Sequence, residues 1–113
     1  MSLVSTNTTI TPEILCKIHA RYPDKVPVVI SQVHRDLEIS RTKFLVSEDV
    51  TVMQLQALIR NRITNLRPEE AIYMFIAKSE CLLAGSCLVL QVFEEYAIEG
   101  VLEILVTKEN TFG

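Results

Sequence analysis

Few side chains in this sequence could act as catalysts or hold a metal ion. The cysteines are Cys16, Cys81 and Cys87, and the histidines are His19 and His34. Cys16 and His19 would share one helix face, but a closed zinc site needs four ligands and the other cysteines lie far along the chain. Neither histidine stands in a motif that would make it the base for a cysteine nucleophile. The sequence therefore predicts no catalytic residue, no metal site and no cofactor.

Glycines and carboxylates are also poorly arranged for chemistry. The three glycines, at positions 85, 100 and 113, are too scattered to form a phosphate-binding loop. Glu94 and Glu95 could offer paired carboxylates, but a solvated helix face is the simpler interpretation. The sequence does not predict an enzyme.

The C-terminal residue has a more specific chemical use. The carboxylate of Gly113 has no Cβ beside it and stands at the end of a polar tail, residues 108–113. Such an end can enter a narrow active site and be activated as an adenylate and then as a thioester. Gly113 is therefore a candidate site of conjugation.

Charge is unevenly distributed along the chain. Eleven Lys and Arg against fourteen Asp and Glu give a formal net charge of −3, which argues against a nucleic-acid partner. Residues 1–67 carry most of the basic groups, and residues 68–113 are strongly acidic. Arg60, Arg62 and Arg67 cluster near a predicted helix end, where they could complement the helix C-terminus or contact an acidic partner.

The elements that would position these residues follow from periodicity and capping signals. We expect helices over 11–22, 51–63 and 86–96, and strands over 26–30, 43–46, 72–77 and 101–107. The clearest helix start is Thr51, which forms a capping-box pattern with Gln54. Residues 1–10 are expected to be loose, and residues 31–41 are expected to be a polar connection.

This order predicts an α+β fold of the β-grasp kind. It has a four-stranded mixed sheet around helix 51–63, with an N-terminal helical extension. The 113 residues suit a single domain, divided into an extension over 1–22, a core over 23–107 and a tail over 108–113. Three unpatterned cysteines and the lack of a signal peptide favour the cytoplasm. The most apolar stretch is too short to span a membrane.

Several short motifs occur in an order that resembles one family. They are RYPDKVPV over 21–28, KFLV over 43–46, DVTV over 49–52 and ENTFG over 109–113. Together they resemble the autophagy ubiquitin-like modifiers of the GABARAP and light-chain-3 type. The resemblance implies a ubiquitin-like core and an amide between the Gly113 carboxylate and phosphatidylethanolamine.

The same resemblance implies a set of partners and a location. Activating and conjugating enzymes would perform the conjugation, so this chain would be their substrate, and a processing cysteine protease is a further implied partner. The protein would reside in the cytoplasm and, lipid-anchored, on the autophagosome membrane. Two acyl chains suffice for a stable membrane anchor.

The resemblance also implies a groove for receptor peptides of the form aromatic-x-x-aliphatic. Residues 43–46 would form an edge strand that an extended peptide can join. The implied aromatic pocket comprises Ile18, Pro27, Val29, Lys43, Leu45 and Val101. The implied aliphatic pocket comprises Phe44, Val46, Val50, Leu55 and Leu58. The basic residues Arg21, Lys25, Lys43 and Arg62 would meet acidic residues beside the motif.

The sequence departs from the family pattern in three places that bear on this groove. Ile14 stands where the family often has an acidic residue, which would make the aromatic pocket more apolar. The segment before Arg21 is short for the family's two N-terminal helices. Val101 replaces an aromatic residue, which predicts a wider pocket that accepts Trp at least as well as Phe.

Two classes of function are compatible with these features. One is a lipid-conjugated modifier that recruits cargo receptors, with conjugation to a protein lysine as a variant. The other is a β-grasp interaction module that is never conjugated.

Overall fold

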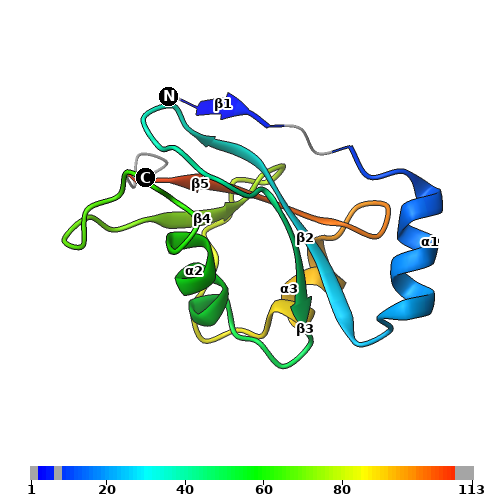
Figure 1. The fold of residues 1–113 in the computed structure, drawn as a ribbon. Helices are drawn as coiled ribbons and strands as arrows, with labels where there is room; N and C mark the ends of the chain where they lie inside the picture. Colours follow the sequence, from blue (N-terminus) through cyan, green and yellow to red (C-terminus); the bar gives the residue numbers. More distant parts are fainter. Residues whose placement is uncertain (1–2, 7–8, 109–113) are drawn as a thin grey trace.

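The computed structural model describes residues 3–6 and 9–108, which form a mixed sheet with helices around it (Figure 1). In chain order the elements are β1 (Leu3–Ser5), α1 (Pro12–Arg21), β2 (Lys25–His34), β3 (Lys43–Ser47), α2 (Val52–Arg60), β4 (Tyr73–Ile76), α3 (Val89–Tyr96) and β5 (Leu102–Thr107). This arrangement confirms the predicted α+β class and the β-grasp architecture.

Strand β2 is the centre of the sheet. On one edge it pairs in parallel with β5, which in turn pairs antiparallel with β4. On its other edge it pairs antiparallel with two strands in succession. β3 takes the first half of this edge, from Lys25 to Val29, and β1 takes the second half, from Gln32 to His34.

The expectation of four strands was wrong, because β1 adds a fifth strand. The expectation of a loose N-terminus was likewise wrong for residues 3–5, while residues 1–2 and 7–8 lie outside the described residues. β2 continues beyond Ile30 to His34, into the stretch that we expected to be a connection. Its extension leaves an edge of unpaired backbone groups beyond β3, and such an edge accepts another extended segment. β1 fills this edge, and the Thr6 N–H extends the ladder by donating to the Ser31 carbonyl at 3.0 Å.

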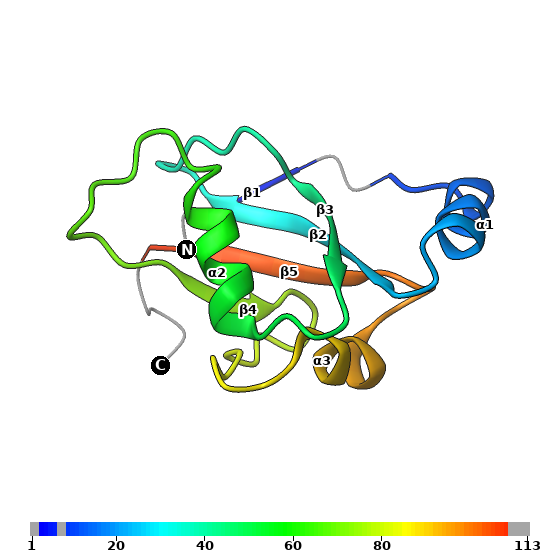
Figure 2. The ribbon, with the colours of Figure 1, turned by 60° about the horizontal axis from the view of Figure 1, so that its bottom comes forward.

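The main core lies between the sheet and α2, which crosses the sheet in Figure 2. Alternate residues of β2 and β5 point toward α2, and its own buried side chains meet them. These residues are Val26, Val28, Ile30, Val52, Leu55, Ile59, Leu102, Ile104 and Val106. The opposite side of the sheet, here called the outer face, carries the remaining alternate residues of these strands.

Helix α2 begins at the predicted capping box. The Thr51 hydroxyl accepts from the Gln54 N–H at 3.2 Å, and the Gln54 side chain accepts from the Thr51 N–H at 2.9 Å. The helix ends at Arg60, before the predicted end, and Ile63 is buried beyond it in a bridge with Ile39. The local signal thus placed the helix start correctly and overextended its end.

Helices α1 and α3 differ in how well the sequence placed them. The Thr11 hydroxyl caps α1 by accepting from the Ile14 N–H at 3.2 Å, as its sequence predicts. No residue of α1 is buried, and Figure 1 shows α1 at the far end of the sheet from β1. α3 starts at Val89 rather than at Ser86.

Within the described residues, no helix is both long enough and apolar enough to cross a bilayer.

Candidate peptide-binding groove

Strand β3 presents one free edge of its backbone. Within residues 3–6 and 9–108 it pairs with β2 alone. The Ile30 N–H donates to the Thr42 carbonyl at 2.8 Å, and hydrogen-bonded positions alternate along an antiparallel ladder. The backbone N–H and C=O groups of Lys43 and Leu45 therefore point away from β2. An extended segment can pair with them.

A cavity of about 200 Å³ opens beside this edge on the outer face. It is lined by Thr9, Ile10, Ile14, Ile18, Pro27, Arg41, Lys43, Phe44 and Leu45. The structure thus brings together four of the six residues expected around an aromatic side chain, namely Ile18, Pro27, Lys43 and Leu45. Leu45 is 38 % exposed, so its side chain is open to a ligand. We call this cavity the outer pocket.

Val29 and Val101, the other two expected residues, lie in a neighbouring cavity. This second cavity has a volume of about 410 Å³ and also contains Leu15 and Glu103. Ile10 lines both cavities, so it stands between Val101 and the outer pocket. Val29 and Val101 are themselves buried. They therefore belong to the outer face of the sheet but not to the lining of the outer pocket.

The five residues expected around an aliphatic side chain fall into three groups according to their burial. Val46 and Leu55 are 3 % and 0 % exposed and belong to the core, so they can support a ligand only from beneath. Phe44 and Val50 are half-buried and pack against the core. Leu58 is 46 % exposed on α2. On the side of β3 that faces α2, the apolar surface open to a ligand therefore consists of Leu58 and the exposed parts of Phe44 and Val50.

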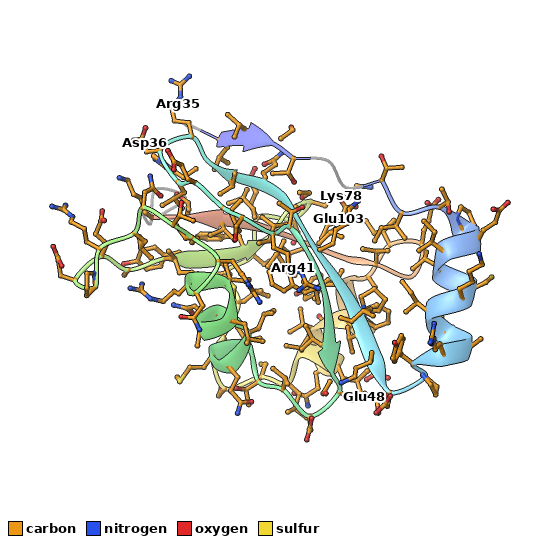
Figure 3. All side chains as sticks on the ribbon, in the orientation of Figure 1. Arg35, Asp36, Arg41, Glu48, Lys78 and Glu103 are labelled. Atoms are coloured by element: carbon orange, nitrogen blue, oxygen red, sulfur yellow. The ribbon has the colours of Figure 1, made fainter. Side chains whose placement is uncertain are left out.

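Two cations stand at the rim of the outer pocket. The Lys43 ammonium donates to the Thr9 carbonyl at 3.2 Å. The Arg41 side chain donates through Nε to the Lys43 carbonyl at 2.8 Å, and its guanidinium lies 5.4 Å from the centroid of the Phe44 ring. Arg41 is labelled in Figure 3, where it lies over the middle of the fold. The rim is thus positively charged, and Arg41 occupies one backbone acceptor of the free edge.

The other basic residues expected to contact acidic groups lie farther along the molecule. The Lys25 ammonium is half-buried and donates to the Ser47 hydroxyl at 2.7 Å. Arg21 is exposed, with its guanidinium 6.0 Å from the Tyr22 ring centroid. Arg62 is exposed beyond the end of α2.

Apart from Ile14, three residues of the outer pocket were not among the expected ones. Arg41 stands two positions before Lys43, so strand alternation could have placed it on the same side. Thr9 and Ile10 belong to the segment that was expected to be loose, and no local signal marks them. Their place in the pocket follows from the pairing of β1 with β2, which is a long-range contact.

The side chains that could ligate a metal are dispersed over the part of the chain that the structure describes. They contain no group of three or more His, Cys, Asp or Glu side chains that could hold a metal ion. Cys16 and Cys81 are exposed, and Cys87 is half-buried. The negative charge of Glu95, with a smaller effect of Cys81, raises the pKa of Tyr96. Gly113, the predicted conjugation residue, lies outside the described residues.

The chain is similar to known proteins over nearly its whole length. A family profile described as "Autophagy protein Atg8 ubiquitin like" matches residues 13–113. Autophagy-related protein 8 of Schizosaccharomyces pombe is 40% identical over 100 residues, which span 86% of this chain and 80% of that protein.

Two solved structures share the fold. ATG8 of Trypanosoma brucei has a TM-score of 0.73 and 27% identity, covering 95% of this chain and 96% of its own. Plasmodium falciparum Atg8, solved in complex with a P. falciparum Atg3 peptide, has the same TM-score and identity and covers 87% of each chain. This chain therefore belongs to the Atg8 family of ubiquitin-like autophagy proteins.

Proposed function

We propose that this protein is joined through Gly113 to phosphatidylethanolamine and recruits cargo receptors to the autophagosome through the groove along β3. Membership of the Atg8 family and the geometry of this groove support the proposal. The Plasmodium relative is described in complex with a peptide of Atg3, which supports a conjugating enzyme as one partner here.

The observation that carries the docking function is the placement of two apolar surfaces on opposite sides of one edge strand. Residues three apart in an extended peptide point to opposite faces, because side chains alternate along a strand. The outer pocket lies on one side of β3, and Leu58 on α2 lies on the other. A peptide paired with Lys43 and Leu45 would therefore place an aromatic residue in the outer pocket and an aliphatic residue three positions later against Leu58.

The charges of the groove favour acidic residues beside this motif. The cations of Arg41 and Lys43 stand at the rim of the outer pocket. Arg41 donates to the Lys43 carbonyl, so its side chain competes with a peptide N–H for that acceptor and is released when the peptide displaces it. The released guanidinium can then pair with a carboxylate of the ligand, and such rim contacts are screened by salt.

Conjugation would require no catalytic group from this chain. The activating and conjugating enzymes supply the cysteines that carry Gly113 as a thioester, and the amine of the lipid then displaces the thiol to form the amide. The two acyl chains of the lipid would give a stable anchor, since one chain alone binds a membrane only marginally.

The docking function can be tested by isothermal titration with an acidic peptide that contains a Trp-x-x-Leu core. We expect Leu45→Ala to weaken binding by roughly 1–3 kcal/mol, as for truncation of a central pocket residue. Leu82→Ala is a matched control, because Leu82 is 55 % exposed in the segment between β4 and α3. Equal affinities of the wild type and Leu45→Ala would place the peptide site elsewhere.

The conjugation function can be tested with activating and conjugating enzymes, ATP and liposomes that contain phosphatidylethanolamine. We expect the wild type to float with the liposomes and the variant without Gly113 to stay in solution. A wild type that binds the peptide but never gains lipid would support the alternative, an interaction module that is not conjugated. Lipidation of the variant without Gly113 would contradict the proposed attachment site.

A further inference from the structure

We infer that Ile10 is a specificity-determining residue of the peptide groove, held in place by β1. This inference rests on the proposed peptide-binding function and adds the N-terminal segment to the site. It concerns residues 3–6 and 9–14, all of which the structure describes. The evidence is the anchoring of this segment, its contact with Lys43 and its position between two cavities.

The segment is anchored before and after Ile10. On one side β1 pairs with β2, and Thr6 adds bonds from its N–H to the Ser31 carbonyl and from its hydroxyl to the Ile30 carbonyl. On the other side Thr11 caps α1. Because both sides are fixed, holding Ile10 against the sheet costs little additional chain entropy.

The residue before Ile10 also contacts the groove directly. The Thr9 carbonyl accepts from the Lys43 ammonium at 3.2 Å. Lys43 is itself a pocket residue on the strand that would receive the peptide. The N-terminal segment thus orients a cation at the rim while Ile10 supplies an apolar wall.

The position of Ile10 decides how wide the outer pocket is. Ile10 lines both the 200 Å³ outer pocket and the 410 Å³ cavity that contains Val29 and Val101. Truncation of Ile10 would open one cavity into the other and remove apolar surface from the aromatic ligand. Truncation of Val101 would leave this wall in place. The size of the accepted aromatic side chain is therefore set by Ile10 more than by Val101.

The first test compares Ile10→Ala, Ile10→Leu and Val101→Ala by titration with paired Trp-x-x-Leu and Phe-x-x-Leu peptides. We expect Ile10→Ala to weaken binding roughly three- to tenfold, since apolar contact scales with the buried methyl groups. Ile10→Leu should restore most of the affinity, and Val101→Ala should change the ratio of Trp to Phe affinity less than Ile10→Ala does. Leu82→Ala again serves as the control for loss of an exposed aliphatic side chain.

The second test loosens β1 without touching the pocket. The bond from the Thr6 N–H to Ser31 implies, by alternation, that the Val4 N–H faces β2 and the Ser5 N–H faces away from it. Val4→Pro should therefore reproduce most of the effect of Ile10→Ala, and Ser5→Pro should have the smaller effect. Circular dichroism of each variant confirms that the core is folded.

Three results separate the possible failures. A wild type that binds neither peptide would contradict the proposed function itself. If the wild type binds the peptides and Ile10→Ala binds them with the same affinity, the role of Ile10 would be overturned. If Ile10→Ala binds the peptides more weakly but Val4→Pro binds them with the affinity of the wild type, the role of β1 would be overturned.

Discussion

At the residue scale, neighbouring positions of β3 have different tasks because their side chains alternate. Leu45 is 38 % exposed and lines the outer pocket, whereas Val46 is 3 % exposed and belongs to the core. A sequence resemblance assigns both to the groove, since it lists positions without their burial. We therefore expect truncation of Leu45 to act on ligands and truncation of Val46 to act on stability.

The turn before β5 depends on a single glycine. Ile98 and Val101 exchange two backbone bonds, of 2.9 Å and 3.1 Å, around Glu99 and Gly100, whose φ values are 52° and 80°. A two-residue hairpin turn with positive φ at both central positions favours Gly or Asn there. Gly100→Ala should lower the free energy of unfolding by about 1–2 kcal/mol in urea denaturation, although its Cβ would lie 3.6 Å from the nearest atom, on Leu15.

The matched variant is Glu99→Asn, which places a residue suited to positive φ at the other central position. We expect this variant to be as stable as the wild type or more stable. A destabilised Glu99→Asn together with an unaffected Gly100→Ala would contradict the strain argument.

A carboxylate near the end of β5 links stability to pH. The Glu70 carboxylate accepts from the Arg67 N–H at 3.0 Å and lies 3.8 Å from the Lys108 ammonium. The bond from the Arg67 backbone, aided by both cations, lowers the pKa of Glu70. Because the folded-state pKa is below that of the unfolded chain, this contribution to stability is present above the unfolded-state pKa. It is lost as the pH falls through the folded-state pKa.

An NMR titration of the Glu70 carboxyl should show this lowered midpoint. On acidification, we expect the free energy of unfolding of Glu70→Gln to fall less than that of the wild type. A Glu70 midpoint at or above the ordinary glutamate value would contradict this role.

At the element scale, the two capped helices differ in what they support. Thr51 caps α2, which buries Val52, Leu55 and Ile59, whereas Thr11 caps α1, which buries none of its residues. Thr51→Ala should therefore lower the free energy of global unfolding by about 1 kcal/mol. Thr11→Ala should leave global unfolding nearly unchanged and increase amide exchange within α1, because a weakly packed element opens locally.

Denaturation and native-state hydrogen exchange of both variants separate these two effects. An equal loss of global stability in Thr11→Ala would show that α1 unfolds together with the core.

At the scale of the whole molecule, the C-terminal end of β5 and the groove lie at opposite ends of the sheet. The parallel pairing of β2 with β5 places Val33 beside Val106, just before the tail. The groove lies beside Pro27, across from Leu45. Pro27 and Val33 are six positions apart along β2, which corresponds to about 20 Å. If the chain were joined to a membrane beyond β5, as proposed, the groove would lie at the other end of the sheet from the point where the tail begins.

We accordingly expect the lipid-attached protein to bind the Trp-x-x-Leu peptide with the same affinity as the free protein. The affinity is measured by co-sedimentation of a labelled peptide with the liposomes. Liposomes without anionic lipid are used so that membrane charge does not repel the acidic peptide. A loss of affinity of tenfold or more on the liposome would contradict the separation of the two sites.

The sequence by itself determined the features that depend on nearby residues. The caps at Thr11 and Thr51, the strand that carries KFLV and the β-grasp order of elements all follow from local spacing and chain order. The motifs around Pro27 and at residues 109–113 were sufficient to indicate the family, because they are short, contiguous and specific.

The tertiary structure alone decided which of these residues meet. β1 carries no local strand signal, and it forms because the extended β2 offers an edge some thirty residues away in the chain. That pairing places Ile10 between the two cavities and separates Val101 from the outer pocket. Burial of Val46 and Leu55 likewise depends on how α2 crosses the sheet. Local sequence records the propensity of each segment, but contacts between distant segments depend on backbone edges and packing surfaces that exist only once the chain has folded.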